Sequence, residues 1–205
     1  DTGASRVVLV SSVVVFGRPA QSPITEETPV GPTRFSEYAR TKYEGDLVAW
    51  QLRETRGLPL VAVYPGSVLG PGDTKASGRY VRNLVERRLP ATMINGCSFP
   101  FVHVIDVADA IVRAAEIPGI EGRQYLVVGD NLTFGQINAM ISEISGVPLP
   151  KLRLPDSMAV AGAAVLTALS GLTHRPPPWG MSWDQIATMT HGPIVDGSRA
   201  TRELG

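Results

Sequence analysis

The chain has 205 residues and 43% hydrophobic content, which is enough to bury a sizeable core and excludes a disordered or fibrous protein. Lysine plus arginine number 19 and aspartate plus glutamate also number 19, so no net charge draws the chain to nucleic acid or to anionic lipid. A small-molecule ligand is therefore the better expectation.

Three features bear on the cellular compartment. Cys97 is the only cysteine, which excludes an internal disulfide and favours a reducing compartment. The longest apolar stretch, at residues 158–169, is shorter than the roughly 20 residues that a membrane span needs. No charged segment followed by an apolar core opens the chain, so no secretory signal is expected. We therefore predict a cytoplasmic protein that does not enter a membrane.

The first elements expected along the chain alternate between strands and a helix. Residues 7–11 are a short β-branched run, apolar in succession up to Ser11, as in a central parallel strand that is buried on both faces. A long helix is expected from about residue 35 to 55, where apolar residues recur every three or four positions, and Gly57 ends it. Residues 59–64 form the next buried strand. This alternation is typical of βαβ units, so the fold class is α/β with a mostly parallel sheet.

The rest of the chain is expected to be less regular. Its next elements are a helix at 80–88, a strand at 99–104, a helix at 107–115 and a strand at 124–128. Further elements are expected in order: a helix opened by a Thr133/Gln136 capping box and ended by Gly146, an alanine-rich helix capped by Asp156, a proline-rich connection at 174–180, a short helix from Ser182 and a last helix at 196–205.

Tyr38 and Lys42 lie one turn apart in the expected long helix, so their side chains project from the same face. An ammonium group near a tyrosine hydroxyl favours the phenolate and eases proton exchange at neutral pH. The pair is thus a candidate for moving a proton to or from a substrate oxygen while a nicotinamide exchanges a hydride. Alone, this spacing is more often a helical packing pair.

Ser11 and Ser12 close the first expected strand, and Val15-Phe16-Gly17 follows. Ligands of open α/β sheets bind at the carboxyl ends of strands, so a serine hydroxyl here can donate to a carbonyl oxygen. Ordinary turn chemistry, in which the side chains bond nearby backbone, is the alternative and fits Ser11 well.

A second strand end carries Tyr64-Pro-Gly-Ser-Val68 and then residues 70–73. Proline removes a backbone amide and glycine allows a ligand to approach the backbone closely. The two strand ends are expected to face one crevice, although residues 70–73 alone are more typical of a surface loop. Further on, Asp106 joins a strand to a helix and is expected to cap that helix.

In combination these motifs resemble the extended short-chain dehydrogenase/reductases of the NAD-dependent epimerase/dehydratase type. Their order is a strand ending in Ser-Ser, then Val-Phe-Gly, Tyr-x-x-x-Lys, Pro-Gly-Ser-Val-x-Gly-Pro and Phe-Val-His-Val-x-Asp-Val-Ala, and the resemblance covers most of residues 6–149. More weakly, the tail at 196–205 resembles the closing segment of those proteins. The resemblance implies the carboxyl-terminal part of a Rossmann-type parallel sheet, at 1–72 and 99–130, with a smaller α+β substrate-binding region at 73–98 and 131–205.

The resemblance also implies roles for individual residues. Tyr38 would be the catalytic acid/base, Lys42 would bind the nicotinamide ribose and support Tyr38, and Ser12 would orient the reacting oxygen. His103 is expected to be structural, and no metal site is implied. Cofactor contacts are implied for Ser11, Tyr38, Lys42, Tyr64, Pro65, Gly66, Ser67 and Val68, and substrate contacts for Val13 and Phe16.

The pattern of the family is incomplete in this sequence. The family opens with a glycine-rich turn that holds the cofactor pyrophosphate, and no such turn precedes Val7. The chain also begins at Asp1 without a methionine, so we expect a fragment that lacks roughly half of the nucleotide fold. The expected cofactor is therefore NAD or NADP, and the sequence does not distinguish the two. A homodimer through the long helix is implied by the resemblance alone.

The loop after the second strand gives some information about the substrate class. Sugar-nucleotide epimerases usually have arginine before the loop proline, whereas Tyr64 stands there and Leu69-Gly-Pro follows. This departure resembles the dihydroflavonol-reductase and 3β-hydroxysteroid-dehydrogenase branch and favours a hydroxy or keto substrate that is reduced or oxidised. A nucleotide-sugar epimerase or dehydratase is the alternative enzyme. A non-catalytic dinucleotide-binding sensor, or an inactive fragment, is the alternative from another class.

Overall fold

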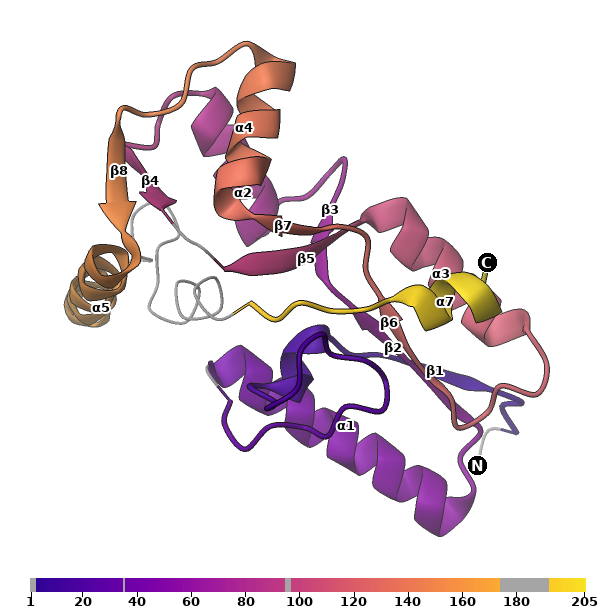
Figure 1. Ribbon diagram of the computed structural model, residues 1–205. Coiled ribbons are helices and arrows are strands. Elements are labelled where there is room, and N and C mark those ends of the chain that lie inside the picture. Colours follow the sequence, from indigo (N-terminus) through magenta and orange to yellow (C-terminus); the bar gives the residue numbers. More distant parts are fainter. Residues whose placement is uncertain (1–2, 35, 95–96, 174–191) are drawn as a thin grey trace. The chain divides into compact units, whose positions relative to one another are not determined.

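The computed structural model describes residues 3–34, 36–94, 97–173 and 192–205 (Figure 1). The chain forms two compact units. Unit 1 consists of Asp1–Val68, Pro100–Asn131 and Pro193–Gly205, and unit 2 consists of Leu69–Phe99 and Leu132–Gly192. The C-terminal segment thus belongs to unit 1. The cofactor and substrate roles expected for the two regions stay predictions.

Unit 1 is built on a parallel sheet of three strands in the order β1-β2-β6. The strands are β1 (Val7–Val10), β2 (Leu60–Pro65) and β6 (Gln124–Val127), and Val63 lies beside Tyr125 in the register of β2 and β6. Every residue of β2 is buried, as expected for a central strand whose two faces are both covered. The same expectation for β1 is wrong: this strand lies at the edge of the described sheet, so it is only half-buried and its Val10 is 40% exposed. The α/β class with a parallel sheet is confirmed.

The two faces of this sheet belong to different apolar clusters, because alternate residues of a strand point to opposite faces. In Figure 1, α1 (Glu37–Arg56) covers one face, while α3 (Val104–Glu116) and α7 (Ser198–Glu203) cover the other. The cluster toward α3 and α7 contains Val61, Val63, Val102, Val107, Ala110, Ala114, Ile120, Tyr125, Val127 and Leu204. The cluster toward α1 contains Val13, Val15, Phe16, Ile24, Ala62, Tyr64, Leu126 and Val195, with Tyr43 and Trp50 of α1 packed against it.

The ends of α1 are set by local chemistry. Ser36 caps its start, where the side chain accepts a hydrogen bond from the Ala39 amide at 3.0 Å. Gly57 ends the helix with a φ of 66°, a left-handed conformation that glycine adopts without the cost of a Cβ atom. The helix therefore occupies nearly the range expected from the sequence.

The start of α3 differs from the expectation. His103 is the capping residue, since its Nδ1 accepts from the Ile105 amide at 3.3 Å, so the helix begins at Val104. Asp106 lies exposed within the first turn, and the prediction that it caps the helix is wrong. The sequence favoured the aspartate because aspartate is a common capping residue, but an imidazole nitrogen can also accept a hydrogen bond from a backbone amide at a helix start.

Unit 2 contains α2 (Ala76–Val85), expected at 80–88. The helix begins earlier because the Asp73 carboxylate accepts from the backbone amides of Lys75 and Gly78, both at 2.7 Å. Its last turn closes at Val85, and Arg87 then takes a positive φ of 57°. The loop residue Asp73 thus organises the start of a helix.

The remaining elements of unit 2 follow the expected order, with additions. The Thr133/Gln136 capping box at the start of α4 (Phe134–Ser145) is confirmed, and Gly146 ends that helix with a φ of 68°. Two strands pair in parallel, β4 (Ala91–Ile94) and β8 (Leu152–Pro155), and α5 (Asp156–Thr173) follows. The short strands through which the chain passes between the units are β3 (Ser67–Leu69), β5 (Ser98–His103) and β7 (Asn131–Thr133).

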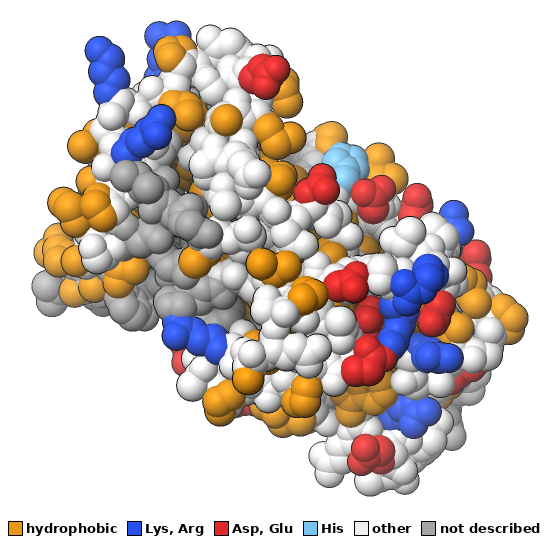
Figure 2. All heavy atoms as spheres, viewed as in Figure 1, with side chains coloured by type: hydrophobic (Ala, Val, Ile, Leu, Met, Phe, Trp, Pro, Cys, Tyr) orange, Lys and Arg blue, Asp and Glu red, His pale blue; other side chains and the backbone are white. Residues whose placement is uncertain are grey.

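Some expectations fall outside the described residues, namely the connection at 174–180 and the helix from Ser182; the side chain of Asp156 is likewise not described. None of the helices in the described part of the chain has both the length and the apolar content that crossing a bilayer requires. On the face drawn in Figure 2, acidic and basic side chains lie intermixed over α3 and α7, and hydrophobic side chains gather over α5.

Candidate functional site

The serine pair lies where β1 ends. The Ser11 amide donates to the Val63 carbonyl at 2.8 Å and continues the ladder between β1 and β2. Ser12 is extended and caps a short 3-10 helix, η1 (Val13–Phe16), where its Oγ accepts from the Val14 amide at 3.4 Å. Both serines are buried. Because Ser12 accepts at Oγ, its hydroxyl proton remains available for donation to a second oxygen.

The residues after Ser12 turn into the core. Val13 is 1% exposed and Phe16 is 3% exposed. The Phe16 ring meets the Tyr64 ring edge to face, with 5.7 Å between the centroids. Their implied contact with a substrate stays a prediction, and these buried side chains present little surface for it.

Tyr38 and Lys42 lie one turn apart on α1, as expected. Tyr38 is 47% exposed, so its ring is open to solvent or to a ligand. The Lys42 ammonium donates to the Val10 carbonyl at 3.4 Å. This contact brings the helix that carries Tyr38 and Lys42 to the end of β1, directly before Ser11 and Ser12.

The loop after β2 combines a buried and a half-buried part. Tyr64 and Pro65 are buried, while Gly66, Ser67 and Val68 are half-buried. The Gly66 amide donates to the Val127 carbonyl at 3.0 Å, and a Cβ atom at this position would lie 2.3 Å from the Pro100 carbonyl oxygen. Only glycine fits this close backbone approach. The implied contacts of this loop with a cofactor stay predictions.

The hydroxyl of Tyr64 is engaged inside the protein. It donates to Oδ2 of Asp46 at 2.9 Å and accepts from Nε1 of Trp50 at 3.1 Å. Burial, followed by the charge of Asp46, raises the pKa of Tyr64, so its hydroxyl keeps its proton and remains a donor. The sequence identified the loop and missed this network.

Asp46 is the residue that sequence reasoning passed over. It is 9% exposed and lies one turn after Lys42 on the buried face of α1. Burial raises the pKa of its carboxyl, and the Tyr64 hydroxyl, then Ser11, Trp50 and the Lys42 charge, oppose that rise. A signal was present, because Asp46 continues the apolar spacing of Ala39 and Tyr43, where a carboxylate is unexpected.

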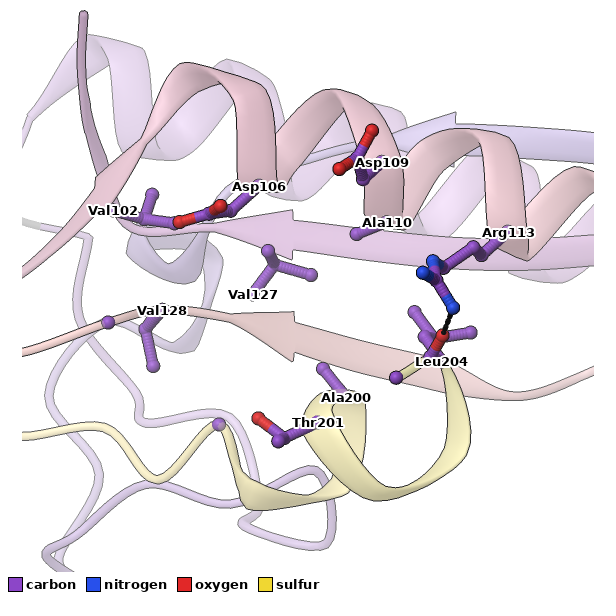
Figure 3. A pocket seen from close by; sticks show the side chains of 13 residues that line it. Val102, Asp106, Asp109, Ala110, Arg113, Val127, Val128, Ala200, Thr201 and Leu204 are labelled. Atoms are coloured by element: carbon purple, nitrogen blue, oxygen red, sulfur yellow. Dashed lines mark hydrogen bonds between the residues drawn. The ribbon is translucent and has the colours of Figure 1, made fainter.

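A pocket of about 260 Å³ lies elsewhere in unit 1, among α3, β6 and α7 (Figure 3). Arg113 spans one end of it and donates to the Leu204 carbonyl at 2.8 Å, and Asp106 and Asp109 line the α3 side. None of the residues predicted for catalysis lines this pocket. The predicted group is instead placed around the ends of β1 and β2 on the α1 side of the sheet.

Comparison with known proteins extends these observations. The model of a family described as the NAD dependent epimerase/dehydratase family matches residues 1–128. A curated protein named sterol demethylase protein B, from Methylococcus capsulatus, is 33% identical over 99% of this chain and 62% of its own length. A putative dihydroflavonol 4-reductase from Synechocystis is 26% identical over 99% of this chain and 60% of its own length.

A solved structure shares the fold as well. A nucleoside-diphosphate-sugar epimerase from Pseudomonas aeruginosa superposes with a TM-score of 0.74 at 26% identity, over 98% of this chain and 60% of that protein. The chain therefore spans about three-fifths of the length of each of these similar proteins.

Proposed function

The chain belongs to the NAD-dependent epimerase/dehydratase family, and on that premise we propose that the natural protein is an NAD(P)-dependent oxidoreductase acting at a carbon that bears a hydroxyl or keto oxygen. Tyr38 exchanges a proton with that oxygen, Ser12 donates a hydrogen bond to it, and Lys42 binds the nicotinamide ribose and supports Tyr38. The observation that carries the proposal is the contact of the Lys42 ammonium with the Val10 carbonyl, because it brings Lys42, on the helix that also carries Tyr38, to the strand end that precedes Ser12.

The residues present fit the nicotinamide end of a dinucleotide. The Lys42 ammonium lies at the carboxyl end of β1, where open α/β sheets bind their ligands. At the end of the neighbouring strand β2, Gly66 lets the backbone pass close to the Pro100 carbonyl. Tyr38 is half-exposed and lies one turn before Lys42 on the same helix face, so its side chain is open to a ligand. A bound nicotinamide supplies the hydride donor or acceptor. These residues favour neither NAD nor NADP.

The substrate class that we propose is a ketone or alcohol rather than a nucleotide sugar. Tyr64 occupies the position before the loop proline, where sugar-nucleotide epimerases usually have arginine. Its buried hydroxyl donates to Asp46, so this position offers no positive charge to a sugar diphosphate. The names of two relatives, a sterol demethylase protein B and a putative dihydroflavonol 4-reductase, support this choice. The similarity to a nucleoside-diphosphate-sugar epimerase keeps a nucleotide sugar as the alternative outcome of the test.

The test compares the natural full-length protein with its Tyr38→Phe variant on a panel of ketones, alcohols and nucleotide sugars. Net oxidation or reduction of the nicotinamide is followed by absorbance, and conversion of nucleotide sugars, which leaves no net change in the nicotinamide, is followed by chromatography of the products. The variant should lose at least about 100-fold in kcat, because the proton donor is gone. Its melting temperature should not change, since the ring is kept and the position is exposed.

Tyr43→Phe is the matched control on the same helix. Arg34 stacks on the Tyr43 ring at 4.0 Å, a contact that a phenylalanine ring preserves. This variant should keep the activity of the parent. Equal turnover in the parent and in Tyr38→Phe would show that the role given to Tyr38 is wrong, and turnover of nucleotide sugars alone would overturn the substrate class.

A further inference from the structure

A buried carboxylate lies behind the proposed catalytic group, and the proposed chemistry does not use it. Asp46 follows Tyr38 by two helical turns and Lys42 by one, on the same face of α1. It touches the end of β2 through the Tyr64 hydroxyl at 2.9 Å. Its other oxygen, Oδ1, and the Ser11 hydroxyl are both buried, and neither has a hydrogen-bond partner of normal geometry among the described residues.

The Ser11 hydroxyl, directly after the end of β1, nevertheless acts on this carboxylate. It favours the charged form of Asp46, as do the Tyr64 hydroxyl, Trp50 and the Lys42 ammonium. Of the titratable groups in the described part of the chain, Tyr64 from β2 and Lys42 from α1 are those that act on Asp46. The carboxylate thus connects the ends of both strands with the helix that carries Tyr38 and Lys42.

A structural role alone does not require a charge at this position. An asparagine has nearly the same shape, its carbonyl oxygen can accept from Tyr64, and its amide can donate to Ser11. Burial disfavours the charged form, so the carboxylate weakens the fold at neutral pH relative to such a neutral residue. What asparagine lacks is the attraction for the Lys42 ammonium.

We propose that Asp46 is a positioning residue, whose buried carboxylate lies one turn after Lys42 on the same helix face, holds the Lys42 ammonium over the end of β1 and attracts the Ser11 hydroxyl. This inference rests on the proposed function, because it gives Asp46 its effect through Lys42. With the carboxylate in place, Lys42 has two attractions that agree, the Val10 carbonyl and the Asp46 charge. Without it, the long and flexible lysine side chain keeps only the 3.4 Å contact with Val10.

The first test is Asp46→Asn in the natural full-length protein, measured in the direction of alcohol oxidation. The pH at which kcat/KM reaches half its maximum should rise by about one unit, because a less well-held Lys42 favours the Tyr38 phenolate less. Loss of the carboxylate charge acts in the opposite direction, but Asp46 lies two turns from Tyr38, so the effect through Lys42 should be the larger. The melting temperature at neutral pH should stay the same or increase. An unchanged pH midpoint, a fall of the midpoint, or a large loss of thermal stability would each overturn the proposal.

Trp50→Phe is the matched control in the same network. It removes the donor to the Tyr64 hydroxyl but leaves both Asp46 and Lys42 in place. Its melting temperature should fall while the pH midpoint stays at the value of the parent. A shift of the midpoint equal to that of Asp46→Asn would show that any disturbance of the network has this effect, and would overturn the specific role of the carboxylate.

A second readout does not depend on turnover. Carbon-13 NMR of the Asp46 carboxyl reports its titration in the parent and in Ser11→Ala. The parent should be ionised at neutral pH, and the pKa of Asp46 should rise in the variant, because a hydroxyl that favours the charge is lost. A neutral Asp46, or an unchanged titration in Ser11→Ala, would overturn the proposal.

These readouts separate the two hypotheses. If no substrate is turned over, or if Tyr38→Phe is fully active, the proposed function fails while the NMR titration still tests the link between Ser11 and Asp46. If Tyr38→Phe is inactive but Asp46→Asn keeps the pH midpoint of the parent, the proposed function stands and the positioning role fails.

Discussion

The two faces of the sheet in unit 1 are made by the same strands and bury different chemistry. Along β2, Val61 and Val63 point toward α3 and α7 into an apolar cluster. Ala62 and Tyr64 point toward α1, where the tyrosine hydroxyl ends in a network with Asp46 and Trp50. One strand thus separates a face that packs hydrocarbon from a face that also buries a charge.

The difference indicates what each face is for. Burial of hydrocarbon stabilises a fold directly, whereas a buried carboxylate stabilises it little or not at all even when its oxygens are bonded. The charged network lies on the face that also carries Tyr38 and Lys42. We therefore expect substitutions toward α3 to change stability alone, and substitutions in the network to change stability and the proposed chemistry together.

The largest loss of stability is expected on the apolar face, for Val63→Ala. Val63 is fully buried at the centre of the sheet, so the lost methyl groups and the cavity should lower the free energy of unfolding by about 2–3 kcal/mol. Activity per folded molecule should not change. Urea unfolding of the natural protein measures the loss, and Val112→Ala on α3, 52% exposed, is the control that should cost less than about 0.5 kcal/mol. Equal losses would contradict the assignment of the core.

A loss of about 2 kcal/mol is expected on the other face for Tyr64→Phe, because a hydrogen bond to a buried charged group is removed. The loss should depend on pH. Burial raises the pKa of Asp46 above its ordinary value, so the carboxyl gains its proton early as the pH falls, and the loss should be largest at neutral pH and shrink in acid. A loss that is the same from neutral to acid pH would show that the charge of Asp46 plays no part.

The sheet of unit 1 was predictable, and parts of unit 2 were not, for a physical reason. A strand buried on both faces is apolar at nearly every position, and this signal is local, as at residues 59–64, which contain most of β2. Residues 7–10 carry the same signal, although β1 is only half-buried. By contrast, β4 and β8 pair residues that are far apart in the chain, such as Ala91 and Leu152, so the sequence of neither segment indicates its partner. The start of α2 was predicted too late because Asp73, which accepts from the amides of Lys75 and Gly78, comes before the apolar residues of this helix.

The proposed site was predictable where it depends on chain order and hidden where it depends on side-chain direction. Tyr38, Lys42 and Ser12 follow from motif spacing and from the rule that strand ends carry function. Asp46 required knowing that the Tyr64 ring points inward to α1 rather than outward to a ligand. Strand alternation between Val63 and Tyr64 sets this direction, but only once the face toward α1 is known.

The smallest effect is expected from a second buried tyrosine, which makes the comparison of the two faces direct. Tyr125 on β6 packs in the apolar cluster toward α3 and α7, and its hydroxyl donates to Oε2 of Glu203 at 3.0 Å. Because Glu203 is exposed, water can replace the lost donor, and Tyr125→Phe should lower the free energy of unfolding by less than about 1 kcal/mol.

The loss of stability in Tyr125→Phe should depend on pH in the basic range, whereas that of Tyr64→Phe depends on pH in the acidic range. Burial, then the Glu203 carboxylate, raises the pKa of Tyr125 to about 12, above the ordinary value near 10. The stabilisation by the hydroxyl should therefore be fully present below about pH 10 and disappear as the pH rises through about 12. Unfolding of the parent and of Tyr125→Phe in urea from about pH 8 to about pH 12, with an absorbance titration of the tyrosines, measures both. If Tyr125→Phe and Tyr64→Phe lose equal stability at neutral pH, the exposure of the acceptor carboxylate does not distinguish the two faces. The buried charge of Asp46 would then contribute no more to stability than the exposed charge of Glu203.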